Sequence, residues 1–387
     1  MEIRPKEAAL RFTLVAFQSF AFAFAFASTS VVVFAQEFHP ARTVNELARP
    51  VVETVQRVAT ARVVLADYDL LKQDFQNLRN LTNDQIDEWL LSKTAYVSTA
   101  QTQQNVVNTD IKVTGETAHA FRPQDYRRAL VFAIDKLGLI DVKGAGSLDP
   151  AQLDHRNGLA TLGEAIREFA YEKLVRLILD HSHAGFETVG SYAVLDYGFE
   201  VIHQNGSKSP AGAVLRRAHN RSVDGSVGGW SEAKALEIEK VFRKYGITSV
   251  GALRNGKYDV LNVQGNKQRA IVDFGGFLTV EKFDKPVANW DTPLHVLMTP
   301  GSSGFTAPDD ALRVPFNIWG FSVSGHDDPK ADNPWIWSHE LADHLHDGTA
   351  QRGDAEQHVR NMLGPVRQRL YGQHCQDLLG ALFRGHP

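Results

Sequence analysis

Between residues 120 and 220, short apolar runs precede and follow one long amphipathic stretch. Few folds are compatible with this order of segments. Four runs have the length and composition of strands, and they cover residues 128–135, 139–143, 191–203 and 211–218. Residues 158–181 instead predict one long helix. Its apolar face is formed by Leu162, Ile166, Phe169, Leu174 and Ile178. This mixture indicates the α+β class, with a sheet-rich half followed by a helical half.

The composition is that of a folded soluble protein, because 43% of the residues are hydrophobic and 22% are charged. The 45 acidic residues nearly balance the 41 basic ones, so no chain-wide charge favours nucleic acid, and we expect no nucleic-acid partner. One cysteine excludes an internal disulfide and a zinc site built from cysteines. A length of 387 residues leaves room for two or three folded units.

The N-terminal segment has the pattern of a targeting sequence. Residues 12–36 contain no charged side chain and follow a short segment with three basic residues, and small residues precede a cleavage point after Ala35. This predicts a signal peptide over residues 1–35 and an exported protein. An uncleaved membrane anchor is the main alternative, with membrane contact confined to residues 12–36. The alternating Phe and Ala also fit a half-buried strand of a cytoplasmic protein.

Residues 36–120 are polar, and their pattern favours helices joined by linkers. Valines recur at helical spacing from Val51 to Val58. Further on, Thr82 or Asn83 precedes an acidic first turn, as an N-cap residue does. We therefore expect a helical N-terminal segment before the sheet-rich half.

Four residues that can carry chemistry follow one another in a fixed order. Lys143 ends a predicted strand, Glu168 lies in the helix that follows, and Asn262 and Asp273 come later, the last in the sequence Asp-Phe-Gly. This is the order of the protein kinase fold, where a strand lysine paired with a helix glutamate holds nucleotide phosphates. A triphosphate also needs a divalent metal, and Mg²⁺ prefers oxygen ligands such as those of Asn262 and Asp273.

The sequence around these residues resembles the selenoprotein O family. That family has L-K-G-A-G, D-G-R-A-V-L-R and S-I-R-E-F in order, followed by P-G-A-V-x-x-R-V-A, H-G-V-M-N-T-D-N, D-Y-G-P-F-G-F and Y-D-P. The matching stretches here are residues 142–146, 156–161, 166–169, 210–218, 255–262, 273–277 and 283–286. The resemblance covers roughly residues 128–290.

The resemblance implies a bilobal, protein kinase-like fold that binds ATP flipped end for end. Proteins of that family transfer AMP, not phosphate, to hydroxyl side chains of proteins. The expected organisation is a sheet-rich N-lobe over residues 121–222 and a helical C-lobe over residues 223–387. The partners would be ATP and an unidentified protein substrate, with Mg²⁺ or Mn²⁺ as the metal.

The resemblance also implies a role for each matching residue. Lys143 and Glu168 would clamp the nucleotide, Arg217 would contact its phosphates, and Arg221 is a weaker match to a second such arginine. Asn262 and Asp273 would hold the metal.

The chain departs from the family at the proposed general base. Leu261 stands where the family has the aspartate before its asparagine, and Asn255 replaces the histidine that opens this loop. Asp259 lies three residues before Asn262 and could act as the base if it came within hydrogen-bond reach of the hydroxyl. A nucleotide-binding pseudokinase that acts as an exported interaction protein is therefore an alternative, as are phosphorylation and glutamylation.

A second pattern suggests zinc, because His339-Glu340 opens a sequence similar to H-E-x-x-H. The next histidine is His344, five residues later, so the two would diverge by about 140° around a helix. Asp343 occupies the position that a second zinc ligand would need. The simpler interpretation is that these residues lie on the surface of a helix. The alternative hypothesis is that the protein is a metallohydrolase.

Overall fold

The computed structural model describes residues 38–103 except 48, 111–123, 128–147 except 135, 158–202, 208–219, short pieces between 238 and 306, and 336–371. All of these belong to a unit spanning Glu37–Pro387, whereas Met1–Gln36 forms a separate unit. The predicted signal peptide or anchor at residues 1–35 thus lies outside the described residues. Within the described parts, no helix has the length and apolar character needed to cross a membrane.

One nine-stranded sheet organises the chain, and every strand in it runs antiparallel to its neighbours. The order is β2-β9-β10-β6-β5-β4-β1-β3, with β7 paired to β10. Its strands are β1 (Val51–Val58), β2 (Arg62–Ala66), β3 (Tyr96–Ser98), β4 (Val113–Arg122), β5 (Ala129–Ile134), β6 (Gly138–Lys143), β7 (Ala160–Thr161), β9 (Ser191–Ile202) and β10 (Lys208–Arg217). The four predicted strands are confirmed as β5, β6, β9 and β10.

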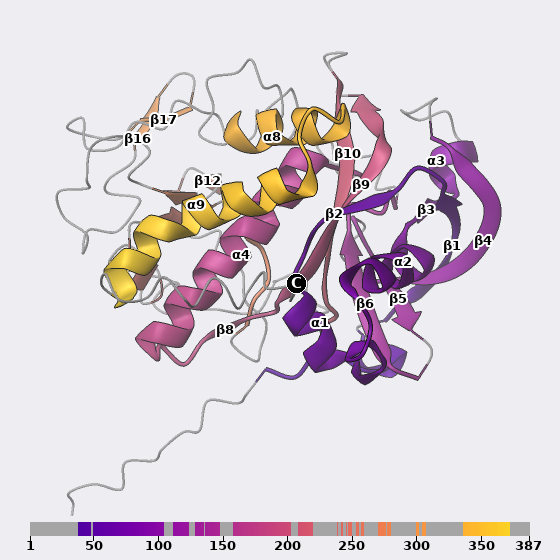
Figure 1. Ribbon diagram of the computed structural model, residues 1–387, viewed down its shortest axis with the longest axis horizontal. Coiled ribbons are helices and arrows are strands. Elements are labelled where there is room, and N and C mark those ends of the chain that lie inside the picture. The colour runs from indigo at the N-terminus through magenta and orange to yellow at the C-terminus, as the bar shows by residue number, and fades with distance from the viewer. Residues whose placement is uncertain are drawn as a thin grey trace, which may run out of the picture. The chain divides into compact units, whose positions relative to one another are not determined.

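Helices cover both faces of this sheet (Figure 1). The α-helices are α1 (Tyr68–Asp74), α2 (Asn83–Thr94), α3 (Ala100–Gln103), α4 (Leu162–Ser182), α8 (Ile336–His346) and α9 (Arg352–Tyr371), with 3-10 turns at η1 (Val44–Glu46) and η2 (Gln76–Leu78). Helices α4, α8 and α9 share one hydrophobic core, and α1 and α2 contribute to a second. The chain therefore belongs to the α+β class with an antiparallel sheet.

Short strand pairs lie outside the large sheet. They are formed by β8 (Glu187–Thr188), β11 (Ile247–Ser249), β12 (Leu253–Arg254), β13 (Lys257–Tyr258), β14 (Ala270–Ile271), β15 (Phe277–Thr279), β16 (Thr299–Gly301) and β17 (Gly304–Thr306). The pair that matters for the site is β14 with β8, which is parallel. Strand β14 ends two residues before Asp273.

Helix α4 confirms the long helix predicted from the apolar spacing, but solvent does not cover its polar side. Its N-cap is Thr161, whose side chain accepts a hydrogen bond from the Glu164 N–H. The five residues of the predicted apolar face are all buried. Charged residues on other sides of the helix are buried as well: Glu164, Arg167, Glu168, Glu172 and Lys173. Buried charges need partners, so this helix is tied to the rest of the protein by ion pairs.

The expected helical character of residues 36–120 is wrong for the parts of the segment that form strands. Helices α1 and α2 are present, and the N-cap of α2 is Thr82. The valines from Val51 to Val58, however, form strand β1, and β2, β3 and β4 join the same large sheet. Val and Thr are β-branched and fit a pleated sheet better than a helix. The spacing of the valines is ambiguous by itself, and pairing with distant strands makes this segment a strand.

The C-terminal helices are fastened to the rest of the unit by charged contacts. His346 Nδ1 of α8 lies 3.1 Å from Asp196 Oδ1 of β9, and Arg62 of β2 pairs with the same carboxylate at 2.9 Å. At the start of α9, the Arg352 guanidinium lies 4.9 Å from the centre of the Tyr68 ring and pairs with Asp87 of α2. Segments from opposite ends of the described chain thus hold one another in place.

The His346 contact should make the attachment of α8 depend on pH. The hydrogen bond to Asp196 raises the pKa of His346 above its ordinary value of 6.5. A raised histidine pKa means that the bond stabilises the fold fully below about pH 6.5 and loses this contribution as the pH rises through the raised value. We expect a loss of about 1–2 kcal/mol, seen as weaker hydrogen-exchange protection of residues 336–346. The same pH dependence in a His346→Gln variant would contradict this assignment.

Candidate functional site

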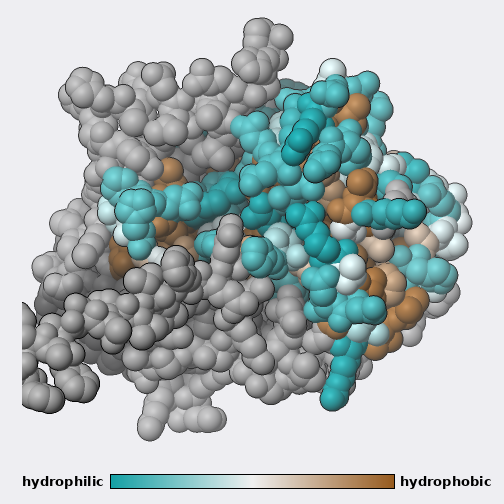
Figure 2. All heavy atoms as spheres, turned by 90° about the horizontal axis from the view of Figure 1, so that it is seen from below, coloured by the Kyte–Doolittle hydropathy of each residue, from teal (hydrophilic) through white to brown (hydrophobic). Residues whose placement is uncertain are grey.

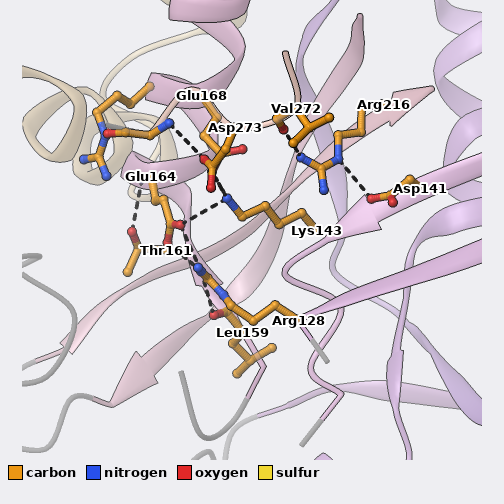
Figure 3. Close-up of polar contacts among 12 residues, drawn as sticks. Arg128, Asp141, Lys143, Leu159, Thr161, Glu164, Glu168, Arg216, Val272 and Asp273 are labelled. Carbon is orange, nitrogen blue, oxygen red and sulfur yellow. Dashed lines mark hydrogen bonds and ion pairs between the residues drawn. The ribbon is translucent and has the colours of Figure 1, made fainter. Parts of the chain in front are cut away.

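Three of the residues singled out by their order in the sequence meet at one point of the structure. Lys143 Nζ, at the end of β6, donates a hydrogen bond to Glu168 Oε1 of α4 and lies 3.3 Å from Asp273 Oδ1 (Figure 3). These partners lie 25 and 130 positions away along the chain. A second helix carboxylate, Glu164 Oε1, is 3.9 Å from the same ammonium group. One cation thus faces three carboxylates.

The alternation of side chains along β6 explains the direction of Lys143. Ile140 and Val142 pack into the core beneath α1 and α2, so Asp141 and Lys143 point to the opposite face, where α4 lies. The strand then turns at Gly144, whose φ is +100°. A Cβ there would lie 2.7 Å from the carbonyl oxygen of Gly212, so this close approach to β10 requires glycine.

Asp273 is positioned by the strand before it and the turn after it. Strand β14, which ends two residues before Asp273, pairs with β8 in parallel register. The Asp273 carboxylate then accepts a hydrogen bond from the Gly275 N–H at 3.3 Å. At Gly275 a Cβ would lie 3.3 Å from Glu168 Oε1, so a residue without a side chain lets the two acidic groups share the site.

The two carboxylates at Lys143 have opposite electrostatic character. Burial raises the pKa of Glu168 despite the nearby ammonium of Lys143. Burial also acts to raise the pKa of Asp273, but the positive charges of Lys143 and Arg216 outweigh it and lower the pKa to about 2. The Asp273 side chain is 28% exposed, whereas that of Glu168 is 2% exposed. The Asp273 carboxylate is therefore ionised and partly exposed at neutral pH, as an oxygen ligand of a metal ion must be, and Glu168 holds Lys143 in place.

Four further charged residues surround this centre, and no motif in the sequence marks them as site residues. Arg128, just before β5, donates to both oxygens of Glu164 at 2.8 and 2.9 Å. Arg216 of β10 donates to Asp141 Oδ1 at 3.0 Å. Arg216 belongs to the site because it lies opposite Asp141 in the β10–β6 register, two residues from the position opposite Lys143, and this register is known only from the structure.

The arginine that the resemblance implied at the phosphates lies on the other side of the sheet. Arg217 pairs with Asp74 of α1 at 2.6 and 2.9 Å, and Tyr192 donates to the same carboxylate. Because neighbouring residues of a strand face opposite ways, Arg216 and not Arg217 shares the face of Lys143. The other predicted site residues, Arg221, Asp259 and Asn262, lie outside the described residues.

The histidines of the zinc hypothesis are directed to three different places. His339 is buried against Gly163 of α4, where a Cβ would lie 2.6 Å from its Nδ1. His344 Nδ1 lies 2.9 Å from Thr349 Oγ1, and His346 contacts Asp196. Across the described parts of the chain, no three His, Cys, Asp or Glu residues are grouped so that they could hold a metal ion. The geometry gives the metallohydrolase hypothesis no support.

The surface of the described residues offers few large apolar side chains. Figure 2 shows one face of the molecule, where hydrophilic residues cover much of the coloured surface and hydrophobic ones form smaller areas. Among the described residues, the large hydrophobic side chains that are exposed are Val51 and Val52 at the start of β1. Among the described residues, the charged centre around Lys143 is therefore a better candidate for a functional site than the apolar surface.

No model of a known protein family matches the chain, and a search of curated proteins finds none with significant similarity. The chemistry of the site is therefore the basis for a function.

Proposed function

We propose that this protein is an ATP-dependent enzyme with a bilobal, kinase-like fold that transfers AMP to hydroxyl side chains of proteins. The observation that carries the proposal is the meeting of Lys143, Glu168 and Asp273 from three separate elements. A strand lysine held by a helix glutamate, beside an ionised aspartate, is the arrangement that phosphate-transferring folds use to hold a nucleotide and its metal. The resemblance to the selenoprotein O family supplies the choice of AMP.

In this proposal each described residue has a defined task. Lys143 would bind a phosphate oxygen through its ammonium group, and Glu168 would keep that group in place. Asp273, together with Asn262, would hold Mg²⁺ or Mn²⁺, which offsets negative charge on the phosphates when bound. Two described features fit such a metal: the Asp273 carboxylate is ionised and partly exposed.

The transfer itself is a displacement at the α-phosphorus. The oxygen of the protein hydroxyl forms a bond to that phosphorus, the bond to the bridging oxygen of the β-phosphate breaks, and pyrophosphate leaves. The hydroxyl proton passes to a base, for which Asp259 is the candidate. The positive charges around the site would stabilise the negative charge that develops on the phosphoryl oxygens.

The experiment uses ATP labelled at the α- or the γ-phosphate, with the protein itself and a mixture of soluble proteins as acceptors. Label should be retained from α-labelled ATP only, and Asp273→Ala should reduce it at least about 100-fold. Asp84→Asn, a change at an exposed position of α2, is the matched control and should retain the wild-type rate. Transfer of γ-label alone would contradict AMP transfer and identify a phosphotransferase.

The second candidate is a nucleotide-binding pseudokinase that acts as an interaction protein. Leu261 favours it, since an apolar side chain at the expected position of the base cannot accept a proton. ATP binding without transfer of either label would support this candidate.

Export belongs to both proposals and rests on residues 1–35. N-terminal sequencing of the mature protein should then begin at Gln36, and an intact Met1 would contradict cleavage.

A further inference from the structure

The chain on either side of Asp273 is held by two arginines from different elements. Arg216 Nη1 of β10 donates to the carbonyl oxygen of Val272 at 2.7 Å. Arg167 Nε of α4 donates to the carbonyl oxygen of Gly275 at 2.9 Å. These carbonyls belong to the residue before Asp273 and the second residue after it. Figure 3 shows the first of these contacts together with Asp141 and Lys143.

Both arginines are themselves fixed. Arg216 is 6% exposed and Arg167 is 3% exposed, so neither guanidinium can move far. Arg216 is also paired with Asp141, which is fully buried on β6. Hydrogen bonds from a charged donor are stronger than those between neutral groups. A carbonyl held by such a donor is therefore held firmly.

The segment needs these contacts because regular structure holds little of it. Strand β14 ends at Ile271, whose carbonyl accepts from the Val189 N–H at 3.0 Å. Beyond this point the two guanidinium groups take the place of ladder hydrogen bonds for the Val272 and Gly275 carbonyls. The placement of Asp273 thus depends on side chains from α4 and β10.

The elements that supply these arginines also place the other members of the charged centre. Arg167 is the residue before Glu168 on α4, and Arg216 is anchored by Asp141, two residues before Lys143 on β6. We propose that Arg167 and Arg216 are positioning residues that hold the Asp273 carboxylate opposite Lys143. Their effect on metal binding rests on the proposed function, whereas their effect on the chain does not.

The test measures the segment and the nucleotide separately, in Arg167→Met and Arg216→Met variants of the full chain. Without nucleotide, hydrogen exchange of residues 270–275 should become roughly tenfold faster or more, while residues 162–182 of α4 keep their protection. Arg217→Met is the matched control on the same strand and should leave residues 270–275 protected. Arg216→Lys keeps one charged donor and should restore most of the protection.

The second readout is the affinity for ATP, measured with Mn²⁺ and with a chelator. In the methionine variants, the increase in ATP affinity caused by Mn²⁺ should be roughly tenfold smaller than in the wild type. The ATP affinity measured with a chelator should stay close to that of the wild type. Unchanged exchange at residues 270–275 in both methionine variants would overturn the inference. Faster exchange throughout α4 would overturn it too, since the arginines would then hold the whole fold. Faster local exchange in a protein that binds no ATP would support the positioning role and refute the proposed function.

Discussion

Replacing Lys143 with methionine is expected to lower the free energy of unfolding by about 3–5 kcal/mol at pH 7. The reason is the burial of its partner, because the Glu168 side chain is only 2% exposed. Without the ammonium group, the Glu168 carboxylate would be a buried charge that has lost its ion-pair partner, beside Glu164 and Asp273. A second change, Glu168→Gln, removes that charge and should recover most of the lost stability.

Urea unfolding of the wild type and of the Lys143→Met and Lys143→Met/Glu168→Gln variants would measure these differences. The pH dependence gives an independent check. A carboxyl group whose pKa is raised by folding favours the folded state at low pH, and this contribution is lost as the pH rises from its ordinary value of 4.5 through the raised one. The wild type should therefore lose some stability on going from pH 4.5 to 7, and the single variant should lose more, because the Lys143 charge that acts to lower the Glu168 pKa is gone. Equal stability of the single and double variants would contradict the assignment.

Replacing Asp67 with alanine should also cost about 3–5 kcal/mol, although it lies outside the charged centre at Lys143. Asp67 Oδ2 lies 2.7 Å from Lys173 Nζ and 2.6 Å from Arg176 Nη2. The Lys173 side chain is 1% exposed, so its ammonium group depends on such partners. The same carboxylate caps α1 by accepting from the Leu70 N–H at 3.0 Å, a contact worth about 1 kcal/mol by itself.

Thermal unfolding of Asp67→Ala and of Asp67→Ala/Lys173→Met measures the stability of each variant, and the difference between them isolates the ion pair. The double variant should be the more stable of the two. Burial acts to raise the pKa of Asp67, but Lys173 and Arg176 outweigh it and hold the pKa far below the ordinary value of 3.8. The wild type should therefore hold this stabilisation above pH 3.8 and lose it as the pH falls further, and Asp67→Ala should lack that loss. A cost below about 1 kcal/mol would show that water replaces the carboxylate.

Apolar patterns carried most of what the sequence revealed about the fold. Local patterns of apolar residues indicate a buried surface. They predicted the strands β5, β6, β9 and β10 and the helix α4. The segment from Val51 to Val58 was misread because its valines fit both periods, and only pairing with β4 and β3 chose the strand. Pairing between strands that lie far apart in the sequence is not visible in a local window.

The site was partly predictable for a similar reason. Lys143, Glu168 and Asp273 could be selected from their order, and the structure brings them together. The choice between Arg216 and Arg217 could not be made, because it depends on the register that sets Val214 opposite Lys143. A shift of one residue would exchange the two faces of the strand. The burial of the polar side of α4 is likewise a consequence of tertiary packing.

Calorimetric titration of ATP with Mg²⁺ into the protein measures whether a nucleotide binds at Lys143. The matched control is the Lys143→Met/Glu168→Gln variant, in which the cation is absent and the buried charge is removed with it. We expect one ATP bound per wild-type chain and an affinity at least roughly tenfold lower in the double variant. Absence of binding to the wild type at millimolar ATP, or equal affinity of the two proteins, would contradict a nucleotide site at Lys143.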